Sequence, residues 1–192
     1  MIRFVTPKDA ADIAGIFAPI VAETAITFQT VPVDKAERLS KIEEITEFYP
    51  WLVFEDAGRV VGYAYASKHR QLGAYRWAVE TSVYVALNTK RGGIGSALYS
   101  ALIPLLNRQG FFHAYAGITL PNPASVAFHE KFGFKQFCLY PRIGHKLGNW
   151  HDVGWWRLEL QKEFPKTPQD PISIKELLKE KPWPLDIISS PT

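Results

Sequence analysis

Residues 83–98 read VYVALNTKRGGIGSAL, an apolar strand that runs into a glycine-rich turn and then opens an amphipathic helix. The first backbone N–H groups of a helix lack partners within it and carry partial positive charge. Glycines let a bulky anion approach that backbone closely. The expected helix, 93–109, has one apolar side, which is typical of a helix that packs on a sheet. The segment therefore predicts a phosphate-binding turn.

The glycine spacing excludes two common nucleotide-binding loops. A P-loop needs glycine, four residues, glycine, then Lys-Ser or Lys-Thr, and the chain has no such spacing. The dinucleotide fingerprint needs a third glycine three residues after Gly95, where Leu98 stands. What remains is Lys90-x-x-Gly93-x-Gly95, in which Lys90 and Arg91 add side-chain charge around a pyrophosphate. A glycine-rich connection without a ligand is the alternative.

The hydrophobic pattern on both sides of this turn predicts an α/β domain over residues 1–161. The expected order is β-α-α-β-β-β-α-β-α-β-β, a mixed and mostly antiparallel sheet with helices on both faces. The expected strands are 2–5, 51–56, 59–68, 77–86, 113–120, 134–140 and 151–161. The expected helices are 7–21 after Thr6, 34–49 capped by Asp34, 93–109 and 122–131.

Length and composition set outer limits. The 192 residues suffice for one well-packed domain, and 47% of them are hydrophobic. A net charge of +3, from scattered Lys and Arg, does not call for nucleic acid, and no apolar run is long enough to span a bilayer. The lone Cys138 excludes an internal disulfide and agrees with a cytoplasmic location.

Residues 162–192 differ in composition and are expected to form an extension of the domain. Six prolines leave only Ile172–Lys181 able to form a short helix. Three states of this extension remain open: packed on the domain, packed on a second subunit, or disordered.

Several side chains could carry chemistry, each with a structural alternative. Glu80 lies in the middle of an apolar strand, where a carboxylate suits a general base if it faces a cavity. Alternatively it is solvated or pairs with Arg76. His129 lies on a helix, where a lone histidine more often packs or faces water. Asn122 would cap that helix. His145, His151 and Asp152 match no strong zinc signature, so no metal site is expected.

Four segments, in this order and spacing, resemble the GCN5-related N-acetyltransferases. The turn at 90–95 is similar to the family's pyrophosphate loop, with Lys90 where Arg or Gln is usual. Residues 122–134, NPASVAFHEKFGF, resemble its second motif, with His129 where most members have Tyr. Residues 75–85 and 144–156, YRWAVETSVYV and GHKLGNWHDVGWW, resemble the phosphinothricin and methionine sulfoximine acetyltransferase branch, which also has the histidine.

This resemblance implies an acetyl-CoA-dependent enzyme that acetylates the α-amino group of a small amino-acid analogue by direct transfer. Glu80 would be the base, acting directly or through water, and His129 would assist the departing thiolate. The implied cofactor contacts are Val83, Tyr84, Val85, Arg91, Gly92, Gly93, Ile94, Gly95, Ser96 and Asn122. The implied substrate contacts are Arg70, Gln71, Leu72, Thr81 and Ser82, and Lys146 is a further cationic candidate.

The resemblance also implies a homodimer, with no nucleic acid or membrane as partner. Two other functions stay open. The cofactor segments would look the same in an enzyme that acetylates peptide or protein N-termini. They would also look the same in a non-catalytic sensor that binds acyl-CoA and leaves its thioester intact.

Overall fold

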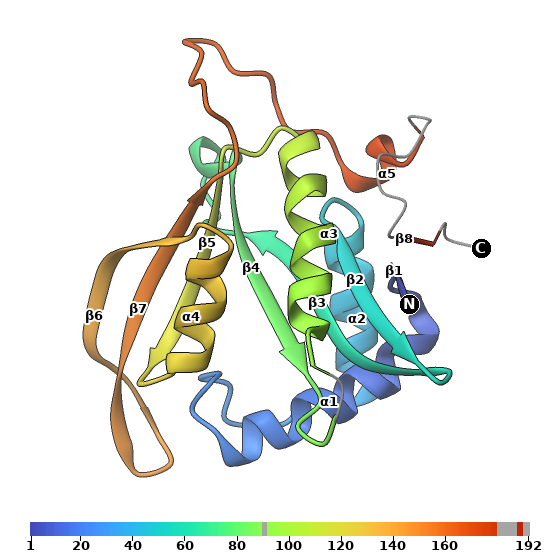
Figure 1. The fold of residues 1–192 in the computed structure, drawn as a ribbon, viewed down its shortest axis with the longest axis vertical. Helices are drawn as coiled ribbons and strands as arrows, with labels where there is room; N and C mark the ends of the chain where they lie inside the picture. The colour runs from blue at the N-terminus through green and yellow to red at the C-terminus, as the bar shows by residue number, and fades with distance from the viewer. Residues whose placement is uncertain (90–91, 180–187, 190–192) are drawn as a thin grey trace.

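A computed structural model describes residues 1–89, 92–179 and 188–189, and within them the strands form one sheet in the order β6-β7-β5-β4-β3-β2-β1-β8 (Figure 1). The strands are β1 Ile2–Phe4, β2 Trp51–Asp56, β3 Arg59–Lys68, β4 Ala78–Val85, β5 His113–Leu120, β6 Lys135–Lys146, β7 Asn149–Glu159 and β8 Ile188–Ser189. Among the strands of the described residues, the pairs β4–β5 and β1–β8 are parallel and the others antiparallel. The predicted mixed, mostly antiparallel sheet is confirmed.

Helices cover both faces of this sheet, as predicted. The helical elements are η1 Pro7–Asp9, α1 Ala10–Glu23, α2 Lys35–Thr46, η2 Gly73–Tyr75, α3 Ile94–Arg108, α4 Pro123–Lys131 and α5 Ile174–Leu177. The apolar side of α3, including Leu98 and Leu102, packs on one face. On the other face Ile13 of α1 and Ile42 of α2 pack against Trp51. The described residues therefore form a three-layer structure with the sheet in the middle.

The parallel strands β4 and β5 stay paired over only three residues each. The register runs Ala78↔His113, Val79↔Ala114 and Glu80↔Tyr115 and then stops, although both strands continue for five more residues. Beyond Glu80, β4 pairs only with β3, and β5 pairs only with β7. Figure 1 shows the two strands diverging toward their C-terminal ends. We call the gap between 81–85 and 116–120 the fork, and its closed end the vertex.

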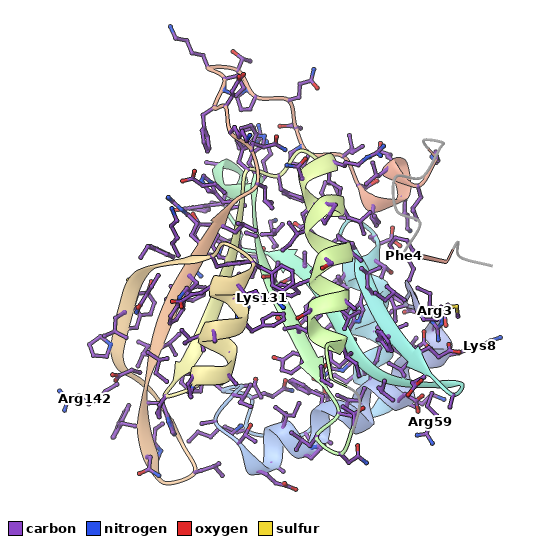
Figure 2. All side chains as sticks on the ribbon, viewed as in Figure 1. Arg3, Phe4, Lys8, Arg59, Lys131 and Arg142 are labelled. Atoms are coloured by element: carbon purple, nitrogen blue, oxygen red, sulfur yellow. The ribbon has the colours of Figure 1, made fainter. Side chains whose placement is uncertain are left out.

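The hairpin of β6 and β7 is longer than predicted. Strands were expected at 134–140 and 151–161, whereas β6 continues to Lys146 and β7 begins at Asn149. Leu147 and Gly148, with φ of 51° and 77°, form the tight turn that lets the strands pair to their ends. Figure 2 shows Arg142 on β6 and Arg59 at the start of β3 on opposite sides of the molecule, both pointing away from the ribbon.

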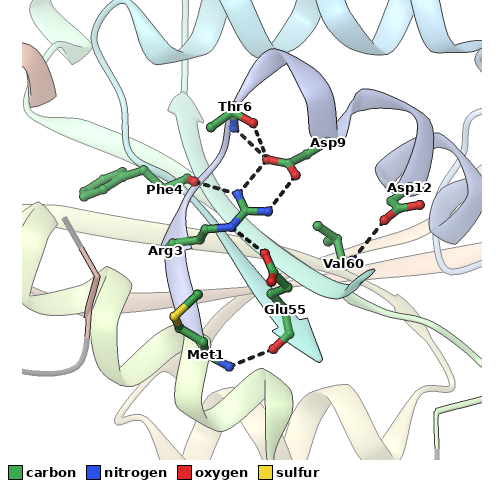
Figure 3. A network of polar contacts seen from close by, with 8 residues as sticks. All are labelled: Met1, Arg3, Phe4, Thr6, Asp9, Asp12, Glu55 and Val60. Carbon is green, nitrogen blue, oxygen red and sulfur yellow. Dashed lines mark hydrogen bonds and ion pairs between the residues drawn. The ribbon is translucent and has the colours of Figure 1, made fainter. Parts of the chain in front are cut away.

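A charged network holds β1 to η1 and β2 (Figure 3). The Arg3 guanidinium donates to both oxygens of Asp9, at 2.7 and 2.8 Å, and to Glu55 at 2.8 Å. Burial alone would raise the pKa of Asp9, but the hydrogen bonds from Arg3 and Thr6 hold that pKa below its usual value. The network therefore fixes the start of α1, which covers the face where Glu80 lies.

The described part of the C-terminal extension packs on the domain. Ile174 and Leu177 of α5 are buried, and they belong to the core cluster that includes the apolar side of α3. Gln109 at the end of α3 donates from Nε2 to the carbonyls of Phe48 and Ile172, at 3.0 and 2.9 Å. The first of the three alternatives therefore holds for residues 171–178, whereas residues 162–170 are mostly exposed and project from the domain (Figure 1). The helix expected at 172–181 is shorter and spans Ile174–Leu177.

Candidate active site

The fork contains a narrow pocket. It has a volume of about 70 Å³ and is lined by residues of β4, β5 and α4, together with Ile26. It shares Ile26, Thr119 and Asn122 with an adjoining cavity of about 290 Å³. The β4 edge that faces the fork is not paired with β5, so its main-chain groups can hydrogen-bond an extended ligand as an added strand would. The predicted cofactor contacts Val83 and Tyr84 line this pocket, and Val85 follows them on β4.

The glycine turn lies where β4 passes into α3. Gly93 is the N-cap of α3 with φ of 81°, a conformation that favours glycine. A Cβ on Gly92 or Gly93 would meet no atom of the described residues within 4 Å. The backbone at these two residues is therefore open to a large anion. The first-turn amides of Ile94, Gly95 and Ser96 come next, at the positive end of the helix dipole.

The other residues expected to bind the cofactor lie in this turn and at the start of α4. A Cβ on Gly95 would lie 3.3 Å from the Phe128 ring, which shows how closely α3 and α4 pack there. The side chains of Lys90 and Arg91, predicted to add charge around a pyrophosphate, lie outside the described residues. Asn122 accepts from the Ser125 amide at 3.1 Å, and so it caps α4 while lining the fork.

Glu80 lies at the vertex and is held by a histidine. Its Oε1 is 2.9 Å from Nδ1 of His69, and the Glu80 and His69 side chains are 33% and 12% exposed. The His69 ring stacks on Tyr115 of β5 at 4.4 Å between centroids. The alternative pairing with Arg76 is wrong, because Arg76 forms its ion pair with Asp170 at 2.6 Å. The carboxylate is thus oriented and still partly accessible to solvent.

Sequence reasoning missed His69, although a signal for it existed. The antiparallel register of β3 and β4 opposes Ser67 with Glu80 and Lys68 with Val79. His69, the next residue, is therefore placed opposite Ala78, just beyond the paired part of β3. This makes His69 the diagonal neighbour of Glu80, and diagonal neighbours on two paired strands are close enough for their side chains to touch. The pairing of the two predicted strands was therefore enough to suggest a partner for Glu80.

His129 is buried behind the vertex in a chain of hydrogen bonds. Its Nδ1 lies 2.8 Å from the Ser125 carbonyl, which can only accept, so Nδ1 carries a proton. Its Nε2 lies 3.1 Å from the Tyr99 hydroxyl, which also lies 3.0 Å from Oγ1 of Thr81. Burial lowers the pKa of His129, so the neutral ring is favoured and Nε2 accepts from Tyr99. The single Tyr99 proton can serve either His129 or Thr81.

We predict that His129 makes the fold less stable in acid. The pKa of His129 in the folded protein is below the ordinary value of 6.5, so between these two pKa values the unfolded chain binds more protons. The free energy of unfolding should therefore fall as the pH drops from 6.5 toward the lowered pKa, and show no such penalty above 6.5. Urea unfolding at about pH 7.5 and 5.5 measures this.

The matched comparison is His129→Phe, which has no proton to gain. Its loss of stability between the two pH values should be smaller than that of the native protein. The pKa of His113 is also lowered by burial, but His113 is present in both proteins and its contribution cancels. Equal losses in the two proteins would contradict the prediction.

The predicted substrate residues do not all share one side of the sheet. Side chains alternate along β4, so Glu80 and Ser82 face the α1 and α2 side. Thr81 faces the α3 side, where it meets Tyr99. The structure therefore brings Ser82, and not Thr81, to the face of Glu80.

The remaining predicted substrate residues are spread around that face. Gln71 lines a larger cavity beside α2, and Leu72 is 72% exposed. Arg70 lies over the Trp155 ring at 6.0 Å. Lys146, at the end of β6, donates to the Thr27 carbonyl at 2.7 Å, and burial lowers its pKa. Lys146 thus ties the loop between α1 and α2 to the β6–β7 hairpin.

In the described ranges 1–89, 92–179 and 188–189, no three His, Cys, Asp or Glu side chains are grouped closely enough to hold a metal ion. Within the same ranges no helix has the length and apolar character needed to cross a bilayer.

The chain is similar to known acetyltransferases over most of its length. A family profile described as "Acetyltransferase (GNAT) domain" matches residues 2–155. Phosphinothricin N-acetyltransferase of Streptomyces viridochromogenes is 37% identical, over 90% of this chain and 94% of that protein. L-methionine sulfoximine/L-methionine sulfone acetyltransferase of Salmonella typhimurium is 36% identical, over 84% of this chain and 95% of that protein.

A solved structure adds the same fold with a ligand. A GNAT superfamily phosphinothricin acetyltransferase from Sinorhizobium meliloti, crystallised in complex with AcCoA, superposes with a TM-score of 0.84 and 32% identity, over 90% of this chain and 94% of that one. GNAT acetyltransferases use acetyl-CoA, and the fork and the glycine turn of this chain suit it. The chain therefore belongs to the GNAT family and is an N-acetyltransferase, as its four sequence segments predicted.

Proposed function

We propose that this enzyme transfers the acetyl group of acetyl-CoA directly to the α-amino group of a small amino-acid analogue such as phosphinothricin or methionine sulfoximine. The relatives that carry these substrates in their names support the proposal. The single observation that carries the proposal is the arrangement of side chains at the vertex. There β4 and β5 separate, with Glu80 and its partner His69 on one face of β4 and Thr81, Tyr99 and His129 on the other.

The cofactor contacts follow from this geometry. The amides of Ile94, Gly95 and Ser96, with Gly92, Gly93 and Arg91, hold the diphosphate. The main chain of Val83, Tyr84 and Val85 pairs with the amides of the pantetheine arm, and Asn122 contacts the arm from α4. Acetyl-CoA supplies the thioester, which this run of contacts along β4 directs to the vertex.

Glu80 is the general base in this proposal. Its carboxylate accepts a proton from the substrate ammonium group, directly or through one water, and the freed amine nitrogen attacks the thioester carbonyl carbon. The bond from that carbon to sulfur breaks as the new bond to nitrogen forms. His69 keeps the carboxylate pointing at the vertex. The N–H of Ala86 donates to β3, and backbone N–H groups alternate sides along a strand, so those of Thr81 and Val83 point away from β3 and into the fork. These two groups stabilise the negative charge that develops on the carbonyl oxygen.

His129 assists the thiolate that leaves. It lines the fork pocket, and its Nε2 shares a hydrogen bond with the Tyr99 hydroxyl. The attacking nitrogen loses its second proton as the amide forms, and the thiolate takes up one proton. Nε2 of His129 can carry this proton, because the Tyr99 hydroxyl can turn its own proton to Thr81 and leave Nε2 free. Most family members have a tyrosine at position 129, and the resemblance implies that it assists the thiolate in the same way.

A thiol-release assay tests the function. Purified enzyme with acetyl-CoA and either phosphinothricin or methionine sulfoximine should release coenzyme thiol well above background. N-acetylphosphinothricin, whose amine is already blocked, is the matched control and should release none. Release only with short peptides that have a free N-terminus would instead support peptide acetylation. Binding of acetyl-CoA without release for any amine would support the non-catalytic sensor.

We propose a homodimer formed through the β6–β7 hairpin. Apolar side chains stand exposed along it: Phe137, Leu139, Ile143, Leu147 and Trp150 are 55, 47, 56, 54 and 64% exposed. A second copy covering this patch would remove it from water. Sedimentation velocity giving the mass of one chain would contradict this. The cytoplasm is our proposed compartment, in keeping with the free thiol of Cys138, and cell fractionation tests it.

A further inference from the structure

A large pocket lies on the Glu80 face of the sheet, outside the fork. Its volume is about 620 Å³, within the range of small-molecule sites, and it lies between α2, the end of β3 and the loop that follows β3. Arg38, Lys41 and Lys68 supply its cations, and Glu37 and Glu44 its anions. None of these five residues was among the predicted site residues.

Arg38 is the unusual member of this lining. It is 2% exposed, its Nε has no hydrogen-bond partner in the described part of the chain, and its guanidinium lies over the Phe17 ring at 4.5 Å. No ion pair among the described residues involves it. A buried cation without a partner anion is costly. The position therefore suits an anion that enters from the pocket.

A second polar group in this region, the Tyr63 hydroxyl, is also fully buried without a hydrogen-bond partner among the described residues. The positive charge of Arg38 acts on Tyr63 and on Tyr84, and the Tyr84 ring packs edge-on against Phe17 at 5.1 Å. These two donors leave hydrogen-bonding capacity in one region that a ligand or water can complete.

The pocket extends from Arg38 toward the vertex, as far as Ser67 of β3. Ser67, which lines it, is directly opposite Glu80 in the register of β3 and β4, so the two side chains share one face. At the other end, Tyr84 lies four residues from Glu80 on the same face, about 13 Å between Cα atoms at roughly 3.3 Å per residue.

We propose that Arg38 binds an anionic group at the end of the substrate's side chain while Glu80 faces the substrate's amine. The guanidinium fork matches the two oxygens of a phosphinate or carboxylate. The enzyme then prefers amino acids with acidic side chains to neutral ones of equal size. This inference rests on the proposed function and specifies its substrate class.

The test compares two substrates in one variant. In Arg38→Gln, kcat/KM for phosphinothricin, whose side chain ends in an anionic phosphinate, should fall about 30-fold or more through KM. For methionine sulfone, similar in length and neutral, it should change less than about threefold. Arg38→Lys keeps the charge without the fork and should lose less on phosphinothricin. Because Arg38→Lys also keeps most of the packing, the two substrates can still be compared in that variant if Arg38→Gln fails to fold.

Arg59→Gln is the matched control. Arg59 lies at the start of β3, 76% exposed and paired with Asp12 at 3.1 Å, and its loss should leave both substrates unaffected (Figure 2). Equal losses on both substrates in the Arg38 variants would overturn the inference, because they would mean a purely structural role. A native enzyme that acetylates neither substrate would instead refute the proposed function, and this inference with it.

Discussion

Replacing Glu80 with Gln is expected to lower kcat by about 100-fold or more, the range that general bases contribute. Gln has the size of Glu but cannot take a proton from the ammonium group, so the amine stays unreactive. The affinity for acetyl-CoA should not change, because the proposed cofactor contacts come from the main chain beyond Glu80 and from the glycine turn. Steady-state kinetics and calorimetric titration of acetyl-CoA measure the two quantities separately.

The control for this substitution is Glu159→Gln. Glu159 pairs with Arg157 at 2.8 Å on the surface, at the C-terminal end of β7, and its loss should leave kcat unchanged. Full turnover by Glu80→Gln would contradict the base hypothesis, for direct and for water-mediated transfer alike. Restoration of its rate by raising the pH, where free amine is abundant, would support that hypothesis, because the defect is then one of deprotonation.

Local chemistry made much of this fold predictable. The bounds of β2, β3 and β5 agree with the expected 51–56, 59–68 and 113–120, because alternating or continuous apolar runs end there at turn residues. Asp34 and Asn122 cap α2 and α4 through hydrogen bonds from amides three residues on, as such residues commonly do. The phosphate turn was visible because its glycines follow a strand and precede a periodic helix.

Long-range contacts could not be predicted in the same way. Most of β6 is exposed, so the alternation that marks a half-buried strand is missing there, and its length became clear only from pairing with β7. The burial of α5 depends on Gln109 and Phe48, both more than 60 residues away. Proline-rich composition alone pointed to an extension and could not say where it lies.

The residues of the site also differ in whether local sequence could predict them. Glu80 was predictable because a carboxylate is out of place in an apolar strand. His69 lies in a loop, and only the register of two strands brings it to Glu80. Arg38 lies on a largely polar helix, where a charged residue normally faces water, so its burial over Phe17 of α1 could not be read from α2 itself. The missed residues depend on contacts between distant elements, whereas the predicted ones were visible from the residue type and its local sequence.

Replacing both Ile174 and Leu177 with Ala is expected to lower the free energy of unfolding by about 4 kcal/mol or more, since each such truncation in a core costs about 2–5 kcal/mol. The two side chains are only 3% and 5% exposed, and they belong to the same cluster as Leu102 and Phe111. The segment that carries them is thus part of the domain's core, although it follows the predicted boundary at 161. Urea unfolding at neutral pH measures the loss.

Lys175→Ala supplies the control from the same helical turn. Its ammonium pairs with Glu47 at 2.6 Å, but the two side chains are 54% and 70% exposed, and such surface pairs contribute about 0–1 kcal/mol. A double variant that unfolds at the native urea concentration would show that α5 detaches before the domain unfolds. In that case residues 1–161 would be the cooperative unit, whereas the expected loss would make residues 171–178 a structural part of the acetyltransferase domain.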